Sequence, residues 1–256
     1  MLVLSLFPGI GLLDTAFEEE GFCVVRGPDL LWGGDIRTFH PPAGKFDGVI
    51  GGPPCQRFSS LVHLVRAAHG EDAIADNLIP EFERVVQECA PTWFVMENVP
   101  KAPLPSVYRY RVDSQTLKDA WVGGETSRTR VFSFGSREGW SLPIQVNALC
   151  VVDPLPAVCG GDRVVPVAIG KRKRPRKDGI SRLGPSLGPR MPVAEMLRRQ
   201  GAPLDLLDAT GFTVSAKRQM VGNGVPLPMG RAIARAVKAA LAESRLPDVQ
   251  AQMEGA

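Results

Sequence analysis

Paired cysteines, histidine clusters and long apolar runs are all missing from this chain of 256 residues. Its five cysteines, at positions 23, 55, 89, 150 and 159, contain no C-x-x-C pair, and an odd number argues against a closed set of disulfides. Three histidines without further ligands at useful spacing predict no metal site. No apolar run approaches membrane-spanning length, and residues 1–6 lack the features of a signal peptide. We therefore expect a cytoplasmic protein with reduced thiols and no membrane contact.

The charge of the chain is nearly balanced, with 30 basic and 27 acidic residues and a net charge of +3. So small an excess says little about nucleic acid, and what matters is where the positive charge gathers. It gathers late, in a run made of Lys171, Arg172, Lys173, Arg174, Arg176 and Lys177. Such a run is either a solvated loop or a phosphate contact, which would add affinity without sequence choice.

Short apolar runs alternate with amphipathic stretches along the first part of the chain. The runs that we interpret as strands cover residues 1–6, 22–25, 47–50, 92–96 and 131–134, and the helical stretches cover 14–20, 78–89, 193–199 and 229–243. This alternation predicts an α/β fold with a doubly wound, mostly parallel sheet. Ligands of such sheets bind at the carboxyl ends of the strands. Phe7, Asp35, Cys55 and Glu97 all fall just after such runs.

The segment Gly51-Gly52-Pro53-Pro54-Cys55 places a lone cysteine on a stiff turn directly after an apolar run. A thiol held in this way is suited to act as a nucleophile. The alternative is a core thiol, which is where unpaired cysteines usually lie.

With its flanks, this segment resembles the Pro-Cys motif of the DNA (cytosine-5) methyltransferases. Other matches follow in the family's order: Phe7-Pro8-Gly9-Ile10-Gly11 is similar to its donor loop, Glu97-Asn98-Val99 to its acid motif, Arg128-Thr129-Arg130 to its paired arginines, and Gly222-Asn223-Gly224-Val225-Pro226 to its last cofactor motif. The matches span most of the chain. They imply a Rossmann-like methyltransferase fold and a monomer that acts on double-stranded DNA.

The resemblance implies transfer of a methyl group to carbon 5 of a cytosine that is flipped out of the duplex. Carbon 5 is a poor nucleophile, so a thiolate must first add at carbon 6, and Cys55 is the candidate. In the family's pattern Glu97 holds a proton at ring nitrogen 3, Arg130 contacts the base carbonyl oxygen and Arg128 supports the site.

The methyl donor implied by the resemblance is S-adenosylmethionine. Phe7 would pack on the adenine, while glycines in the loop let the backbone approach the donor. The residues that the resemblance assigns to donor binding are Phe7, Gly9, Ile10, Gly11, Asp29, Asp35, Ile36, Pro53, Asn223 and Val225.

Target recognition is implied for the region between the arginine and asparagine motifs. We expect a catalytic and cofactor-binding domain over residues 1–138, completed by 212–256, and a small, loop-rich target-recognition domain over 139–211. Residues 57–76 resemble the family's mobile loop, which closes over the substrate. DNA contacts are expected from Gln56, Arg57 and Ser59 and from the basic run, Lys171, Arg172, Lys173, Arg174, Arg176 and Lys177.

The chain also departs from the family's pattern. The acid that normally follows the second strand and holds the ribose is missing at Arg26, and Asp29 is the candidate substitute. Only five residues separate Asp29 from Asp35, too few for the family's usual helix. Thr126 stands where the arginine motif begins with glutamine, and Gly224 follows Asn223 in place of a hydroxyl residue or alanine.

Two other functions remain open from the sequence. One is an RNA cytosine-5 methyltransferase, since nothing in residues 139–190 distinguishes a DNA groove from a folded RNA. The other is a catalytically idle nucleic-acid-binding relative, which the missing ribose acid favours and the presence of all four catalytic candidates opposes. The biological purpose, whether restriction protection, nuclease evasion or regulation, is equally open.

Overall fold

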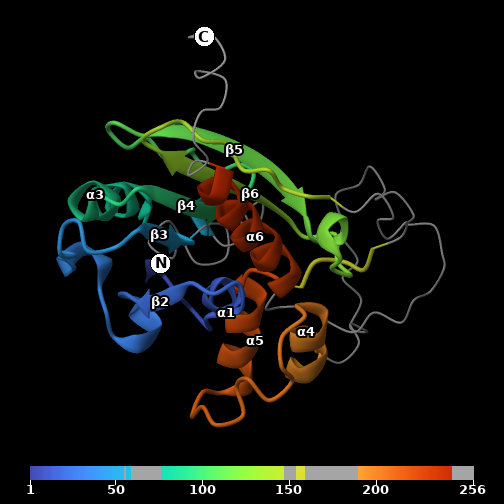
Figure 1. Ribbon diagram of the computed structural model, residues 1–256. Coiled ribbons are helices and arrows are strands. Elements are labelled where there is room, and N and C mark those ends of the chain that lie inside the picture. Colours follow the sequence, from blue (N-terminus) through green and yellow to red (C-terminus); the bar gives the residue numbers. More distant parts are fainter. Residues whose placement is uncertain (55, 59–75, 147–153, 159–189, 244–256) are drawn as a thin grey trace, which may run out of the picture.

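The computed structural model describes residues 1–54, 56–58, 76–146, 154–158 and 190–243 (Figure 1). Within these residues six strands form one sheet in the order β2-β1-β3-β4-β6-β5. The strands are β1 (Leu2–Leu6), β2 (Cys23–Arg26), β3 (Gly48–Gly51), β4 (Trp93–Asn98), β5 (Arg111–Lys118) and β6 (Thr129–Ser136). Strands β2, β1, β3 and β4 run parallel, and β6 and β5 continue the sheet antiparallel. The α/β fold with a mostly parallel sheet is confirmed.

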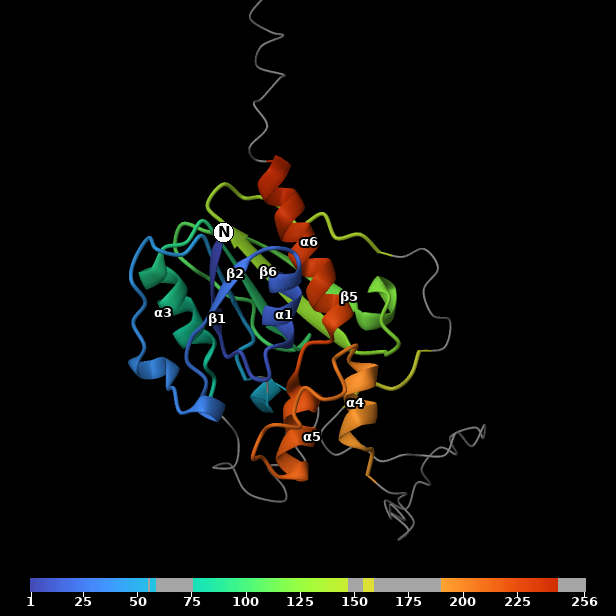
Figure 2. The same cartoon turned by 60° about the horizontal axis from the view of Figure 1, so that its bottom comes forward.

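Helices cover both faces of the sheet (Figure 2). The helices are α1 (Leu12–Glu19), α3 (Ile79–Cys89), α4 (Val193–Arg199), α5 (Val214–Asn223) and α6 (Leu227–Glu243), with short 3-10 turns η1 (Leu30–Trp32), η2 (Ile36–Thr38), η3 (Gln56–Phe58) and η5 (Asp119–Val122). Helices α1 and α6 pack on one face, and α3 packs on the other. None of the described helices is long and apolar enough to cross a membrane.

The alternation of side chains along the strands explains this double covering. In β4 Trp93 and Val95 face α1 and α6, whereas Phe94 and Met96 face α3. Successive residues of a strand point to opposite faces, so a strand apolar at every position needs a cover on each side. In α3 the apolar residues recur with helical spacing and bury one face, formed by Ile79, Phe82, Val85, Val86 and Cys89.

Two elements were not expected from the sequence, and several boundaries differ, of which the end of β4 matters for the site. Strand β5 and helix α5 carry mixed polar residues and no strong apolar pattern. Strand β4 extends through Asn98, so Glu97 is the last but one residue of the strand. The sequence had placed Glu97 just after the strand. Backbone pairing with β6 accounts for the extension, since Glu97 stands opposite Phe132.

The division into two domains stays a prediction. In the region assigned to target recognition, Trp140, Leu142 and Ile144 pack against the core on the α6 face. Met196 and Leu197 of α4 form a smaller apolar cluster with Ile10, Leu12, Val158 and Val221, among others. The described parts of residues 139–211 are therefore anchored on the sheet domain.

Two large aromatic rings of β4 each lie directly over a glycine of the neighbouring strand. Trp93 stands opposite Gly48 across the β3–β4 pair, and Phe94 stands opposite Gly135 across the β4–β6 pair. A Cβ atom on either glycine would collide with the facing ring. Both rings are fully buried, so they have no free space into which they could retreat.

Gly135→Ala is accordingly expected to destabilise the fold by about 1–3 kcal/mol, because an added methyl group overpacks the core. In a chain of this size that loss lowers the Tm by several degrees, roughly 2–4 °C per kcal/mol. Thermal unfolding of the purified protein measures it. Gly211→Ala is the matched control, since a Cβ there meets no atom within 4 Å. Equal Tm values for the two variants would contradict the packing argument.

Candidate active site

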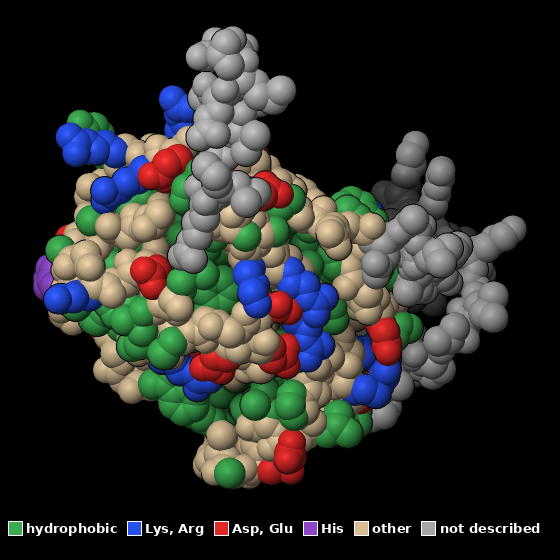
Figure 3. Space-filling model, in the orientation of Figure 1, with side chains coloured by type: hydrophobic (Ala, Val, Ile, Leu, Met, Phe, Trp, Pro, Cys, Tyr) green, Lys and Arg blue, Asp and Glu red, His purple; other side chains and the backbone are tan. Residues whose placement is uncertain are grey.

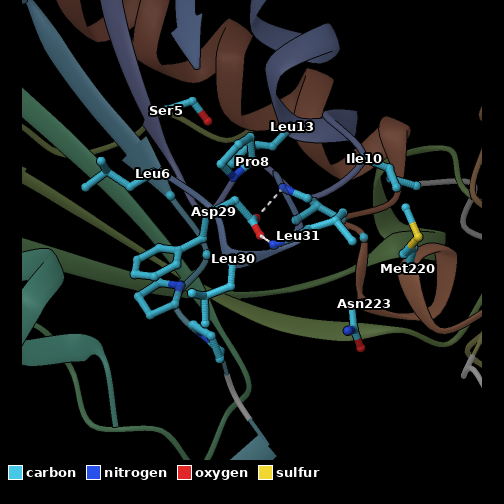
Figure 4. Close-up of a pocket in the computed structure, with 18 of the residues that line it drawn as sticks. Ser5, Leu6, Pro8, Ile10, Leu13, Asp29, Leu30, Leu31, Met220 and Asn223 are labelled. Carbon is cyan, nitrogen blue, oxygen red and sulfur yellow. Dashed lines mark hydrogen bonds between the residues drawn. The ribbon is translucent and has the colours of Figure 1, made fainter. Parts of the chain in front are cut away.

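A cavity of about 490 Å³ opens at the carboxyl ends of β1, β3 and β4 (Figure 4). Strands β2 and β3 flank β1 on opposite sides, and such a switch point is where open α/β sheets bind ligands. The volume lies in the usual range of small-molecule sites, roughly 300–1,000 Å³. Eight residues that the sequence assigned to the donor line this cavity: Phe7, Gly9, Ile10, Asp29, Ile36, Pro53, Asn223 and Val225.

The loop after β1 is held in an unusual backbone conformation. Phe7 and Gly9 both have a φ of 56°, and for phenylalanine this left-handed region is uncommon. Backbone strain of this kind persists only where the surroundings hold it, and it gathers at ligand sites. The space over Gly9 is open, because a Cβ there meets no atom within 4 Å. The backbone at Gly9 is thus accessible to a ligand.

Asp29 fixes this loop to the segment after β2. Its Oδ2 accepts a hydrogen bond from the Gly9 amide at 2.8 Å, and its Oδ1 accepts one from the Leu31 amide at 2.8 Å. The indole Nε1 of Trp32 donates to the Gly9 carbonyl at 2.9 Å. Figure 4 shows Asp29 among the residues that line the cavity, with dashed lines for its hydrogen bonds. The short turn η1 therefore takes the place of a longer connection and presents Asp29 to the donor loop.

Gly11 and Asp35, which the sequence also assigned to donor binding, are not among the residues that line the cavity. Gly11 begins α1 with a φ of 78°, and the Arg26 guanidinium covers it so closely that a Cβ would touch Nη2. Asp35 begins η2, where its Oδ1 accepts from the Arg37 amide at 3.0 Å, and it pairs with the Arg37 guanidinium at 3.4 Å. Their assigned contacts with the donor stay predictions.

A buried acid at the cavity was missed by the sequence analysis. Asp14 lies in α1 and lines the cavity together with Ser5 of β1. Burial raises the pKa of the Asp14 carboxyl, while the hydrogen bond from Ser5 Oγ at 2.5 Å and the ion pair with Arg26 at 3.1 Å act in the opposite direction. A serine inside an otherwise apolar strand was the available signal for this pair.

Glu97 and Arg130 meet at the far end of the same cavity. Glu97 lines it, and its Oε1 lies 2.7 Å from Arg130 Nε, with both side chains at least 85% buried. Arg130 stands two residues before Phe132, the partner of Glu97 across the β4–β6 pair, so both side chains share one face of the sheet. This contact holds both side chains in a fixed geometry.

The turn that carries Cys55 adjoins this pair. Gly52 lies so close to Glu97 that a Cβ would come within 3.0 Å of Oε2, and Asn98 Nδ2 donates to the Pro53 carbonyl at 3.4 Å. Pro53 and Pro54 line the cavity. Cys55 itself lies outside the described residues, one position beyond Pro54.

Arg128 occupies a different place from Arg130. It is 2% exposed, and its guanidinium donates to three backbone carbonyl oxygens: Val158 at 3.0 Å, Gly222 at 2.9 Å and Asn223 at 3.4 Å. It thus holds the loop that ends α5 and lines the cavity. Gly224 in that loop packs on Leu12, where a Cβ would come within 3.0 Å of a methyl group, which explains glycine at this position.

Most of the residues predicted to contact DNA lie in parts of the chain that the structure does not describe. Ser59 and the basic run Lys171, Arg172, Lys173, Arg174, Arg176 and Lys177 lie outside the described residues. Arg57 is exposed on η3, and Gln56 begins that turn. Among the residues that the structure describes, no group of histidine, cysteine and acidic side chains is arranged to hold a metal.

Known proteins resemble this chain in sequence and in fold. A family profile for C-5 cytosine-specific DNA methylases matches residues 33–150. The type II methyltransferase M.AquIA of Picosynechococcus is 30% identical over 73% of this chain and 90% of its own length. The type II methyltransferase M.HgiDI of Herpetosiphon aurantiacus is 25% identical over 96% of this chain and 97% of its own length.

Solved structures agree in fold. The methyltransferase EhMeth of Entamoeba histolytica superposes with a TM-score of 0.64 at 14% identity, covering 94% of this chain and 98% of that one. Dnmt2 of S. pombe superposes with a TM-score of 0.61 at 14% identity, covering 96% of this chain and 100% of that one. With these matches and the arrangement around Glu97, the chain belongs to the DNA (cytosine-5) methyltransferase family.

Proposed function

We propose that this protein transfers a methyl group from S-adenosylmethionine to carbon 5 of a flipped-out cytosine in double-stranded DNA, through a covalent bond from Cys55. The observation that carries the proposal is the Glu97–Arg130 pair at one end of the cavity, beside the Pro53-Pro54 turn that leads to Cys55. The other end of the same cavity is the donor loop at Gly9. Base and donor would thus meet between them.

The cavity fits the proposed donor. Gly9 offers open backbone, Asp29 and Asn223 supply polar atoms, and the remaining wall is mostly apolar, as expected for a site that buries an adenine and a thioether chain. When bound, S-adenosylmethionine supplies an electrophilic methyl group on a sulfonium. Phe7, Pro8 and Ile36 are placed to enclose it, and Val225 closes the side formed by the end of α5.

Each catalytic residue has a defined task in this proposal. The Cys55 thiolate adds to carbon 6 of the cytosine, and the electron pair of the 5,6 double bond moves into the ring. Glu97, as a carboxylic acid, holds its proton at ring nitrogen 3, and Arg130 donates to the base carbonyl oxygen, where negative charge develops. The addition would make carbon 5 nucleophilic toward the donor's methyl group, and the donor would leave as a neutral thioether. Transfer of the carbon-5 proton to water and departure of the Cys55 thiolate would restore the ring.

The two cysteines that the structure describes, Cys23 and Cys89, are poor candidates for the nucleophile. Burial raises the pKa of the Cys89 thiol to about 11, which keeps it protonated and unreactive. Cys23 is exposed, but it begins β2, at the opposite end of the strands from the cavity. These two residues support assignment of the nucleophile to the Pro-Cys turn.

Charge on the described surface also helps to locate the DNA. The face over α1 and α6 carries interspersed acidic and basic side chains (Figure 3). There Arg231 pairs with Glu19 at 2.5 Å and Arg235 pairs with Glu20 at 2.7 Å. Such a neutralised face is unsuited to a polyanion. We therefore place the DNA on the cavity side, where Arg57 is exposed and where the basic run would add phosphate contacts.

An RNA substrate is the second candidate, and the same trapping experiment tests it. Purified protein is incubated with labelled S-adenosylmethionine and either duplex DNA or RNA that contains fluorocytosine, which cannot lose a proton from carbon 5. A labelled adduct on DNA supports the proposal, whereas an adduct on RNA alone overturns the DNA assignment. The absence of an adduct on either, with no rise of Tm on adding donor, would indicate an idle relative.

Cys55→Ala is expected to reduce methyl transfer and adduct formation to background, because the variant lacks the thiolate proposed to add at carbon 6. The dissociation constant for S-adenosylmethionine, measured by calorimetry, should stay within about twofold of the wild-type value. Cys23→Ala is the matched control and should retain full activity. Methyl transfer by Cys55→Ala would remove Cys55 from the mechanism.

Asp29→Ala is expected to release the donor loop, because the Gly9 and Leu31 amides lose a charged acceptor worth about 1.5–3 kcal/mol each. Hydrogen exchange at both amides should accelerate roughly 10- to 100-fold, and donor affinity should fall at least about tenfold. Asp47→Ala removes a comparable bond to the Leu2 amide, 2.6 Å long, at the other end of β1. It should leave donor affinity unchanged. If both variants bind the donor equally well, Asp29 is not needed to form the site.

Replacement of the basic residues of 171–177 by alanine is expected to weaken DNA binding and to flatten its salt dependence without changing the preferred sequence. With slope about −0.9 per neutralised phosphate, loss of three contacts would reduce the slope of log K against log salt by roughly 2.7. Fluorescence anisotropy at several salt concentrations measures it. An unchanged slope would return the run to a solvated loop.

A further inference from the structure

A second acid, Asp119, is completely buried beneath the arginine motif. It begins η5, and its Oδ2 accepts hydrogen bonds from the amide of Thr126 at 3.0 Å and from its hydroxyl at 2.7 Å. The backbone joins the same place twice more, since the Asp119 amide donates to the Arg128 carbonyl and the Gly124 amide donates to the Asp119 carbonyl, both at 2.9 Å.

The position of Asp119 is costly unless it is compensated. Burial raises the pKa of its carboxyl, and the hydrogen bonds from Thr126 and the positive charge of Arg128 oppose that rise. The negative charge of Glu125, like burial, raises the pKa of Asp119. Gly124 lies against both carboxylate oxygens, and a side chain there would collide with them. Asp119 leaves room only for glycine at position 124. Burial of a carboxyl group is costly unless hydrogen bonds and nearby positive charge compensate for it, and at Asp119 the compensating groups are Thr126 and Arg128.

The groups that it organises lead to the donor cavity. Thr126 Oγ1 also accepts from the Arg128 amide at 3.4 Å, so the turn from Asp119 fixes where the Arg128 side chain begins. The Arg128 guanidinium then holds the carbonyls of Gly222 and Asn223. Asn223, Gly224 and Val225 form part of the cavity wall. One continuous polar network thus joins η5 to the end of α5.

The same turn anchors the segment 154–158. The Ser127 amide donates to the Leu155 carbonyl at 2.7 Å, the Leu155 amide donates to the Glu125 carbonyl at 2.8 Å, and Arg128 reaches the Val158 carbonyl. This segment lies within residues 139–211, the region expected to recognise the target. The network therefore has a second arm, and residues 154–158 in that arm do not line the donor cavity.

We propose that Asp119 is a positioning residue for donor binding, which acts through Thr126 and Arg128 to hold residues 222–225 against the cavity. The inference rests on the proposed function, because it takes the cavity as the donor site. Thr126 stands where the family's motif begins with glutamine, and its short hydroxyl reaches Asp119. Asp119 and Thr126 together set the arginine turn in this chain.

The test compares donor binding by calorimetry, with S-adenosylmethionine itself as the probe, in wild type, Asp119→Ala, Asp119→Asn and Thr126→Val. We expect about tenfold weaker binding in Asp119→Ala, and a smaller loss in Asp119→Asn, which keeps an acceptor but no charge, and in Thr126→Val. The kcat at saturating donor should change less than KM for the donor.

A merely structural role predicts a different pattern. Val237→Ala opens a cavity in the core beneath α6 and should lower the Tm without changing the donor dissociation constant. If the Asp119 variants behave in the same way, with lower Tm and unchanged donor affinity, the proposal is wrong. Should Asp119→Ala fail to fold, Asp119→Asn and Thr126→Val carry the same comparison.

A double-mutant cycle tests the route through Arg128. Arg128→Met alone should weaken donor binding, and Asp119→Asn added to it should have little further effect, because the first change has already disconnected the loop. Additive losses would overturn the route. A wild-type protein that does not bind the donor would instead refute the proposed function, so the two failures are distinguishable.

Discussion

The pairing of β1 with β3 and of β3 with β4 is the constraint on which the site depends. Their register brings Leu6, Gly51 and Met96 to one level of the sheet, so the next residues of all three strands meet at one edge. Those residues are Phe7, Gly52 and Glu97: Phe7 begins the loop after β1, Gly52 begins the Pro53-Pro54 turn, and Glu97 is the last but one residue of β4. Parallel strands always bring their carboxyl ends together, and here three motifs separated by up to 90 residues become neighbours for that reason alone.

Register brings the loops together, but buried polar contacts to the backbone give each loop its shape. Asp29 binds the amide of Gly9, Asn98 binds the carbonyl of Pro53, and Arg128 binds the carbonyls of the loop after α5. In each case a side chain from one motif satisfies the backbone of another, which a loop without regular structure cannot do for itself. In this chain the motifs are therefore connected to each other by hydrogen bonds, and not only by their order in the sequence.

Much of this arrangement could be predicted because it leaves a local signal. Apolar runs indicated β1, β3 and β4, and the helical spacing of Phe82 and Val85 indicated α3, since burial on a sheet demands these patterns. Strand β5 left none: it lies at the edge of the sheet, its residues are mostly polar, and pairing with β6 defines it. The ion pair between Glu97 and Arg130 was foreseeable as two catalytic candidates, but its geometry arises from antiparallel register between segments more than thirty residues apart.

The departures from the family's pattern are where local reasoning was weakest, and the structure shows why they occur together. The connection after β2 is short, and Asp29, at the start of η1, lies within reach of the Gly9 amide. The loss of glutamine at Thr126 is matched by a buried acid at Asp119, seven residues earlier. When one sequence is compared with the family's motifs residue by residue, each such change looks like the loss of a functional group. In the folded chain each belongs to a pair in contact, and the free energy of a contact depends on both partners.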